Sequence, residues 1–108
     1  MTEREFQDPV IELARLLGWR VHHTRPARVR VRGKEAYRTP IAGHKGFPDL
    51  VLARRGRVIF AELKAGRGQL SEDQVLWRDA MEGGRAEMFS GWKVWRPEDW
   101  AEIERILR

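Results

Sequence analysis

Apolar residues near the start of the chain recur at helical spacing, which predicts an amphipathic helix. Residues three and four positions apart line one side of a helix, and Gly18 is expected to end it. Two signals compete for its start. Thr2 with Glu5 is typical of a capping box and would place Pro9 inside the helix. Asp8 as N-cap would instead place Pro9 at the first helical position. The apolar side is formed by Phe6, Val10, Leu13 and Leu17.

Two apolar strands in the middle of the chain are separated by a two-residue turn, Arg55-Gly56. Side chains of a strand alternate between its faces. A hairpin of this length places Asp49, at the start of the first strand, across from the end of the second. In the second strand one face carries Ile59, Ala61 and Leu63, and the other carries Val58, Phe60, Glu62 and Lys64.

The remaining elements follow from alternation, caps and turn residues. They are a strand over 19–24; a basic hairpin over 28–38 with its turn at Gly33-Lys34; a helix from Ser71 and Gln74 to Gly83, with Val75, Leu76, Met81 and Trp77 as its apolar side; a strand over 86–95 interrupted at Gly91; and a helix opened by Pro97, with Trp100, Ile103, Ile106 and Leu107 as its buried side. This order predicts one α/β (α+β) domain over 1–108, with a mixed central sheet flanked by helices and a basic hairpin or arm as an insertion.

The positive charge is concentrated in one segment. The chain carries a formal net charge of +5, but residues 25–45 alone carry +6 because seven basic residues face the single acid Glu35. A localised basic segment indicates contact with nucleic acid, although a solvated loop in an arginine-biased protein would look the same. The predicted DNA contacts are Arg25, Arg28, Arg30, Arg32, Lys34, Arg38, His44 and Lys45.

Composition excludes several other classes of protein. No run of 18 apolar residues and no apolar segment behind the charged N-terminus is present, so a membrane span and a secretory signal are not expected. The chain has no cysteine, which excludes disulfides and thiolate zinc sites and favours a cytoplasmic, intracellular location. The three histidines, His22, His23 and His44, are not spaced like a zinc site.

Asp49, Glu62 and Lys64 are the candidate catalytic group. Two carboxylates and an ammonium would converge where two apolar strands meet water, and burial of such charges costs several kcal/mol unless they are paired or bind a metal. Carboxylate oxygens suit Mg²⁺. An ordinary cross-strand salt bridge on a surface hairpin is the alternative interpretation.

The order of these motifs resembles the PD-(D/E)xK nuclease superfamily, and within it the stand-alone VRR-NUC domains carried by phages. The resemblance is carried by Gly46-Phe47-Pro48-Asp49, then Glu62-Leu63-Lys64, then Gln74. It implies a restriction-endonuclease-like core in which Asp49, Glu62 and the backbone carbonyl of Leu63 coordinate Mg²⁺ or Mn²⁺. Lys64 would orient the attacking water, and Gln74 would act in the site, cap its helix, or both.

The resemblance also implies an acid from the first helix near the metal. Glu5 and Glu12 compete for this role, and Glu5 is preferred because Glu5-Phe6-Gln7 looks most like the family; both could instead be surface acids. The expected function is a structure-selective DNA endonuclease, resembling Holliday-junction resolvases that act as homodimers on branched DNA. The alternatives are a flap nuclease, nickase or restriction-like enzyme of the same fold, and a DNA-binding module without catalysis.

Overall fold

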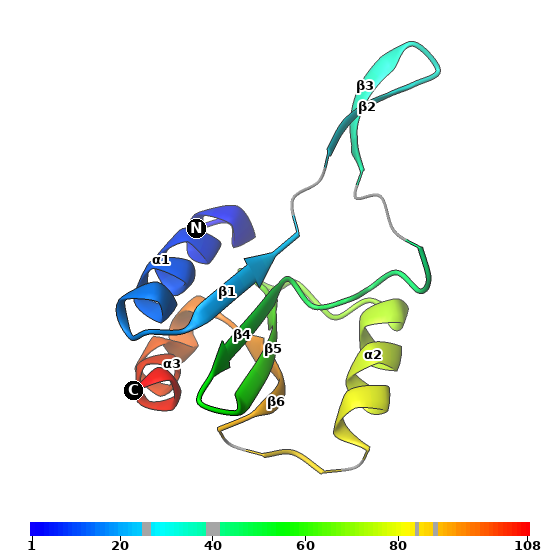
Figure 1. The fold of residues 1–108 in the computed structure, drawn as a ribbon. Helices are drawn as coiled ribbons and strands as arrows, with labels where there is room; N and C mark the ends of the chain where they lie inside the picture. The colour runs from blue at the N-terminus through cyan, green and yellow to red at the C-terminus, as the bar shows by residue number, and fades with distance from the viewer. Residues whose placement is uncertain (25–26, 39–41, 84, 88) are drawn as a thin grey trace.

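The structure is a computed structural model that describes residues 1–24, 27–38, 42–83, 85–87 and 89–108 (Figure 1). Its strands form a four-stranded sheet, ordered β1-β4-β5-β6, and a separate two-stranded sheet, β2-β3. The elements are α1 (Glu3–Leu16), β1 (Arg20–His23), β2 (Ala27–Val31), β3 (Lys34–Arg38), β4 (Leu50–Arg54), β5 (Arg57–Leu63), α2 (Glu72–Glu82), β6 (Gly91–Trp95), the 3₁₀ turn η1 (Pro97–Asp99) and α3 (Trp100–Leu107).

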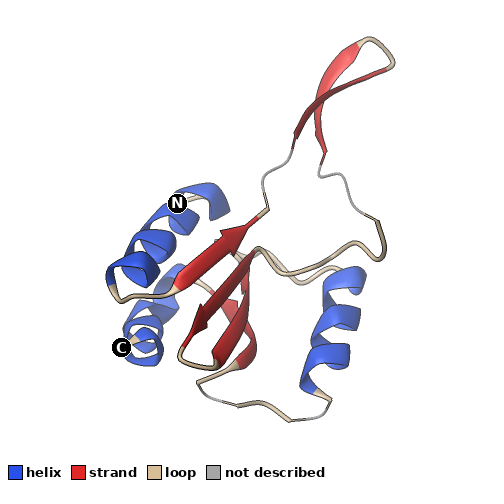
Figure 2. Cartoon of the chain, viewed as in Figure 1, coloured by secondary structure: helices blue, strands red, loops and turns tan. Residues whose placement is uncertain are grey.

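The main sheet is mixed, as predicted. β1 pairs with β4 and β4 with β5 in antiparallel fashion, whereas β5 and β6 run parallel. A parallel neighbour needs a crossover connection, which α2 supplies between β5 and β6. The fold is therefore mixed α+β, with helices flanking a four-stranded mixed sheet (Figure 2).

The first helix begins at the earlier of the two predicted starts. The Thr2 hydroxyl accepts a hydrogen bond from the Glu5 backbone N–H at 3.1 Å, and Pro9 lies inside the helix. The helix ends at Leu16, and Gly18 adopts a φ of +86°, which glycine tolerates without a steric cost. This start makes Glu3 the first helical residue.

The hydrophobic core lies between one face of the main sheet and the helices α1 and α3, which run side by side (Figure 1). Ile59, Ala61 and Leu63 are buried there, as their alternation in β5 predicts. Trp19 closes one end of this core, and its indole N–H donates to the Leu107 carbonyl at 2.9 Å. The opposite face of the sheet is left for α2.

The predicted apolar side of α2 is wrong in one respect. No residue of this helix is buried, and Leu76 is 61% exposed. The helix reaches the sheet through aromatic edges instead: the rings of Phe47 and Trp77 lie 5.0 Å apart, and those of Phe47 and Phe60 lie 6.0 Å apart. The capping box at its start is confirmed, because Ser71 and Gln74 exchange both hydrogen bonds.

The last strand is shorter than predicted, because β6 begins at Gly91 rather than near residue 86. Its first pair is Ile59 with Gly91. Just before it, the Phe89 carbonyl accepts hydrogen bonds from the Arg57 side chain at 2.8 and 2.9 Å, so this backbone oxygen is occupied by a guanidinium. The last helix is confirmed, with Ile103, Ile106 and Leu107 buried behind the turn that Pro97 opens.

The predicted basic hairpin forms β2 and β3 and projects away from the main sheet (Figure 1). Its turn is Arg32-Gly33, one residue earlier than predicted, with φ values of +54° and +76°. Two consecutive positive φ angles match the type I′ turn that favours tight hairpins. Across the described residues, no helix combines the length and the apolar character needed to cross a bilayer.

Candidate active site

The β4–β5 hairpin brings Asp49 to the end of β5. Its turn, Arg55-Gly56, has φ values of +50° and +82°, and the register pairs Leu50 with Ala61. Asp49 is thereby placed next to Glu62, and its Oδ2 accepts a hydrogen bond from the Leu63 backbone N–H at 2.8 Å. This hydrogen bond from Leu63 to the Asp49 side chain extends the β4–β5 ladder beyond its last backbone pair, and it holds the Asp49 carboxylate at the end of the sheet.

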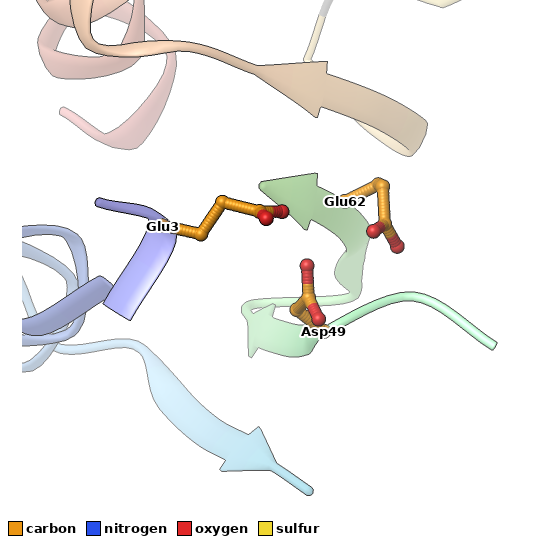
Figure 3. Close-up of side chains that lie close together, drawn as sticks. All are labelled: Glu3, Asp49 and Glu62. Atoms are coloured by element: carbon orange, nitrogen blue, oxygen red, sulfur yellow. The ribbon is translucent and has the colours of Figure 1, made fainter. Parts of the chain in front are cut away.

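A third carboxylate joins these two from the start of α1. Glu3, Asp49 and Glu62 each offer one oxygen, and these oxygens all lie within 4.8 Å of one another. Figure 3 shows the three side chains converging from α1, from the residue before β4, and from β5. Among the described residues, no histidine belongs to such a group. We call these three residues the acidic cluster.

The acid that α1 contributes is Glu3, and neither Glu5 nor Glu12 takes part in the cluster. The reason is the helical period. Glu3 stands seven positions before the buried Val10 and so lies on the same side of the helix, whereas Glu5 lies about 140° away from Val10 around the axis. Glu5 and Glu12 are exposed. The apolar stripe of the sequence, extended back to the first helical residue, contains the signal that identifies Glu3.

Glu62 is the most unusual of the three acids because it is only 2% exposed. Burial, together with the negative charge of the neighbouring Asp49, raises the pKa of Glu62 from 4.5 to about 8. Glu3 acts in the same direction, and the ammonium of Lys64 opposes it. In the absence of a bound cation, this carboxyl group therefore holds its proton at neutral pH.

Lys64 lies beside the cluster, as its position directly after β5, two residues from Glu62, predicts. Its Nζ is 3.8 Å from Glu62 Oε1 and 4.0 Å from Glu3 Oε1, and its side chain is 11% exposed. One partly buried ammonium thus faces three carboxylates. That ratio leaves the site with an excess of negative charge when all three are ionised, which a second cation would offset.

Gln74 connects α2 to the same site. Its Nε2 donates to Glu62 Oε1 at 2.8 Å, while its Oε1 accepts from the Ser71 backbone N–H at 2.9 Å. The side chain therefore caps its helix and orients Glu62 at once, so the two roles considered for it are compatible. Gly46 allows this approach of α2: a Cβ on it would stand 2.7 Å from the Asp73 backbone carbon.

The oxygens of this site fit a hard divalent cation. Carboxylates are the protein ligands that Mg²⁺ prefers, and the buried Glu62 needs positive charge beyond that of Lys64 to ionise at neutral pH. The Leu63 carbonyl, also predicted as a ligand, belongs to the residue whose N–H binds Asp49. In an extended strand both groups of a residue face the same neighbour, so this carbonyl lies on the Asp49 side of β5.

The predicted DNA contacts fall in two places outside the cluster. Arg30, Arg32 and Lys34 are exposed on the projecting hairpin. Arg28 and Arg38 occupy strand positions in β2 and β3, and Arg25 lies outside the described residues. His44 and Lys45 are exposed in the loop before Asp49, and the Lys45 ammonium lies 3.8 Å from the Asp73 carboxylate.

Comparison of the chain with protein-family models, with curated proteins and with solved structures finds no match in any of the three.

Proposed function

We propose that the protein is a Mg²⁺-dependent DNA endonuclease of the PD-(D/E)xK type, with a restriction-endonuclease-like core. The acidic cluster is the observation that carries the proposal: three carboxylate oxygens within 4.8 Å, one of them on a nearly inaccessible side chain, with an ammonium 3.8 Å away. Stability alone does not favour such a group, because like charges so close raise the free energy of the folded chain. Binding of a cation and then of a phosphate explains it.

Each residue has a defined task in phosphodiester hydrolysis. Asp49, Glu62 and Glu3 would hold the cation, which supplies Lewis-acid polarisation of the phosphate and a bound water of lowered pKa. Asp49 is oriented by the Leu63 N–H and Glu62 by the Gln74 amide, so neither carboxylate has to reorganise when substrate arrives.

Lys64 acts on the phosphate. Its ammonium carries three donors and lies 3.8 Å from Glu62 Oε1, on a side chain that is 11% exposed. A donor so placed orients the attacking water and stabilises the negative charge that grows on the phosphate oxygens in the transition state. The carboxylates alone would repel a phosphate, and Lys64 lowers that repulsion.

The exposed hairpin provides the contact with DNA beyond the cleaved bond. Arg30, Arg32 and Lys34 are exposed on this hairpin, so their charged groups can contact phosphates. The described residues of one chain hold one acidic cluster, and paired cuts across a symmetric junction need two. The Holliday-junction substrate that the resemblance implies therefore goes with a homodimer, the commonest closed assembly.

The test is cleavage of an end-labelled four-way junction beside a linear duplex of the same sequence, with Mg²⁺, Mn²⁺ or EDTA. Asp49→Asn and Glu62→Gln should each lose more activity than the roughly 10–100-fold typical of outer partners of a metal ligand. Glu12→Gln is the matched control, because it removes one exposed carboxylate from α1 on the side away from the cluster. Full metal-dependent activity in either site variant would show that the cluster is not the active centre.

The same assay separates the proposed substrate from its rivals. Paired symmetric cuts in the junction, with a dimer in sedimentation at micromolar protein, support the resolvase. Single-strand nicks by a monomer indicate a flap nuclease or nickase, and cuts in the linear duplex indicate a restriction-like enzyme. Binding without cleavage under any metal indicates a DNA-binding module.

A further inference from the structure

A group of arginines lies at the end of the main sheet opposite to the acidic cluster. A cavity of about 450 Å³ opens there around the β4–β5 turn, next to the C-terminal end of α1. Of the residues that the structure describes, four arginines and no acidic residue line it. The four are Arg20, Arg54, Arg55 and Arg57, and we call this place the arginine pocket.

Two of these arginines, Arg54 and Arg57, are held by backbone oxygens and by the Trp19 ring. Arg57 donates to the Phe89 carbonyl at 2.8 and 2.9 Å and to the Ile106 carbonyl at 2.8 Å. Its guanidinium lies 4.9 Å from the centre of the Trp19 ring, a cation–π distance. Carbonyls and an indole orient the charge without neutralising it, so the positive charge of Arg57 remains available at the pocket.

Arg54 completes the support on the same indole. It donates to the Leu17 carbonyl at 2.8 Å and to the backbone oxygen of Arg108 at 2.9 Å, and its guanidinium lies 4.6 Å from the Trp19 ring centre. These contacts tie the end of α1 and the end of α3 to the β4–β5 turn. We assign Arg54 to the scaffold of the pocket and not to its binding surface.

The other two arginines are the groups that a ligand would meet first. Arg20 and Arg55 are exposed, and within the described residues the side chain of neither forms a hydrogen bond or an ion pair. Arg20 stands in β1 opposite Ala53, so it reaches the pocket from the strand next to the turn that carries Arg55. By the register, Arg20 shares a face of the sheet with Ala53 and Val58, whereas Arg57 lies on the other face with Trp19, so the pocket gathers positive charge from both faces at this end of the sheet.

We propose that the arginine pocket binds phosphate groups of a nucleic-acid backbone, at a place separate from both the acidic cluster and the projecting hairpin. A planar guanidinium matches phosphate with two parallel hydrogen bonds, and most contacts that position a protein on DNA go to phosphates. A polymer is favoured over a small phosphate because the unpaired arginines stand on the surface, where a strand lying across the turn reaches both.

The distance between the arginine pocket and the acidic cluster indicates which part of a bound DNA the pocket contacts. Glu62 follows Arg57 by five residues in β5. At ~3.3 Å per residue, these two positions are about 17 Å apart along the strand. Since DNA rises about 3.4 Å per base pair along each strand, this equals roughly five base pairs. The pocket therefore holds backbone away from any phosphate at the cluster, and its binding does not depend on hydrolysis.

The experiment measures binding alone, in EDTA, so that a failure of the proposed nuclease activity leaves it unaffected. Binding of a fluorescent 30-base-pair duplex is titrated over a series of salt concentrations. Arg20→Gln with Arg55→Gln should weaken binding at every salt concentration and flatten the plot of log K against log salt by up to about 1.8, or ~0.9 for each lost phosphate contact. Both side chains are exposed, so the double variant is expected to fold, and its melting temperature checks this.

Arg105→Gln is the matched control, because it removes an exposed arginine of α3 that is 3.9 Å from Glu102 and does not line the pocket. Its slope should equal that of the unaltered protein. Arg20→Lys with Arg55→Lys should restore the slope, since the charges return. Equal losses in the pocket variant and the control, or an unchanged slope in the pocket variant, would overturn the proposal.

A second arm tests the other source of phosphate. The shift in melting temperature caused by inorganic pyrophosphate is measured at constant ionic strength. If the double Gln variant loses that shift but binds the duplex normally, the pocket takes a small anion and the assignment to a nucleic-acid backbone is overturned. Loss of duplex affinity in the double variant, with no loss in the control, supports it.

Discussion

Replacement of Glu62 by glutamine should make the metal-free protein more stable at alkaline pH and no more stable at acidic pH. Glu62 is 2% exposed, and its pKa is raised from 4.5 to about 8 by burial and by Asp49. Between these two values the folded chain holds a proton that the unfolded chain has released. Stability therefore falls as the pH rises through this window.

The size of the effect follows from the same numbers. Each unit of pKa difference corresponds to about 1.4 kcal/mol, so the unaltered protein should lose a few kcal/mol of unfolding free energy between pH 4.5 and pH 8 through this one group. Glu62→Gln removes the titration but keeps an oxygen that can accept from Gln74 Nε2, a bond of 2.8 Å. The variant should thus retain the stability that the unaltered protein loses.

Urea unfolding in EDTA at several values between pH 4 and pH 9 measures this difference. Subtraction of the two curves cancels the other titrating groups, and Glu12→Gln shows what loss of an exposed carboxylate does. Addition of Mg²⁺ at pH 8 should stabilise the unaltered protein and not Glu62→Gln, because the cation takes the place of the proton. A difference that is constant with pH, or an advantage of the variant that shrinks as the pH rises, would refute the reasoning.

Three further perturbations test other parts of the molecule. Lys64→Ala should lower turnover strongly without weakening cation binding, and calorimetric titration with Mg²⁺ or Mn²⁺ beside single-turnover cleavage separates the two; weaker cation binding would contradict it. Alanine at Arg30 and Arg32 should flatten the salt dependence of junction binding by up to ~0.9 per lost phosphate contact, and an unchanged slope would mean that they do not touch the backbone. Gly46→Ala should destabilise the protein by about 1–3 kcal/mol, because residue 46 has a φ of +91° and its new Cβ would stand 2.7 Å from the Asp73 backbone; an unchanged urea midpoint would show that the loop can move aside.

Local sequence determined most of the elements and two of the three residues of the acidic cluster. Asp49 and Glu62 are predictable because one hairpin holds them, and a two-residue turn with alternating strands leaves a single register that buries Ile59 and Ala61. The caps at Thr2 and Ser71 are similarly local, since each is made within four residues of the helix start.

Contacts between distant segments decided the rest. The apolar stripe places Glu3 on the core side of α1, but only the packing of that helix against the sheet brings its carboxylate to Asp49 and Glu62. Gln74 reaches Glu62 only because α2 crosses back over the sheet, and the same placement leaves Leu76 exposed despite its apolar character.

The arginine pocket shows the same division most clearly. Its members come from β1 and from the β4–β5 turn, and their common support is Trp19, whose position the core determines. Sequence alone presents these arginines as scattered members of an arginine-rich composition. The periodicity of a sequence shows which side of its own helix or strand a residue occupies. Whether charged residues of different elements meet depends on how those elements pack against one another. Burial of the whole hydrophobic core determines this packing.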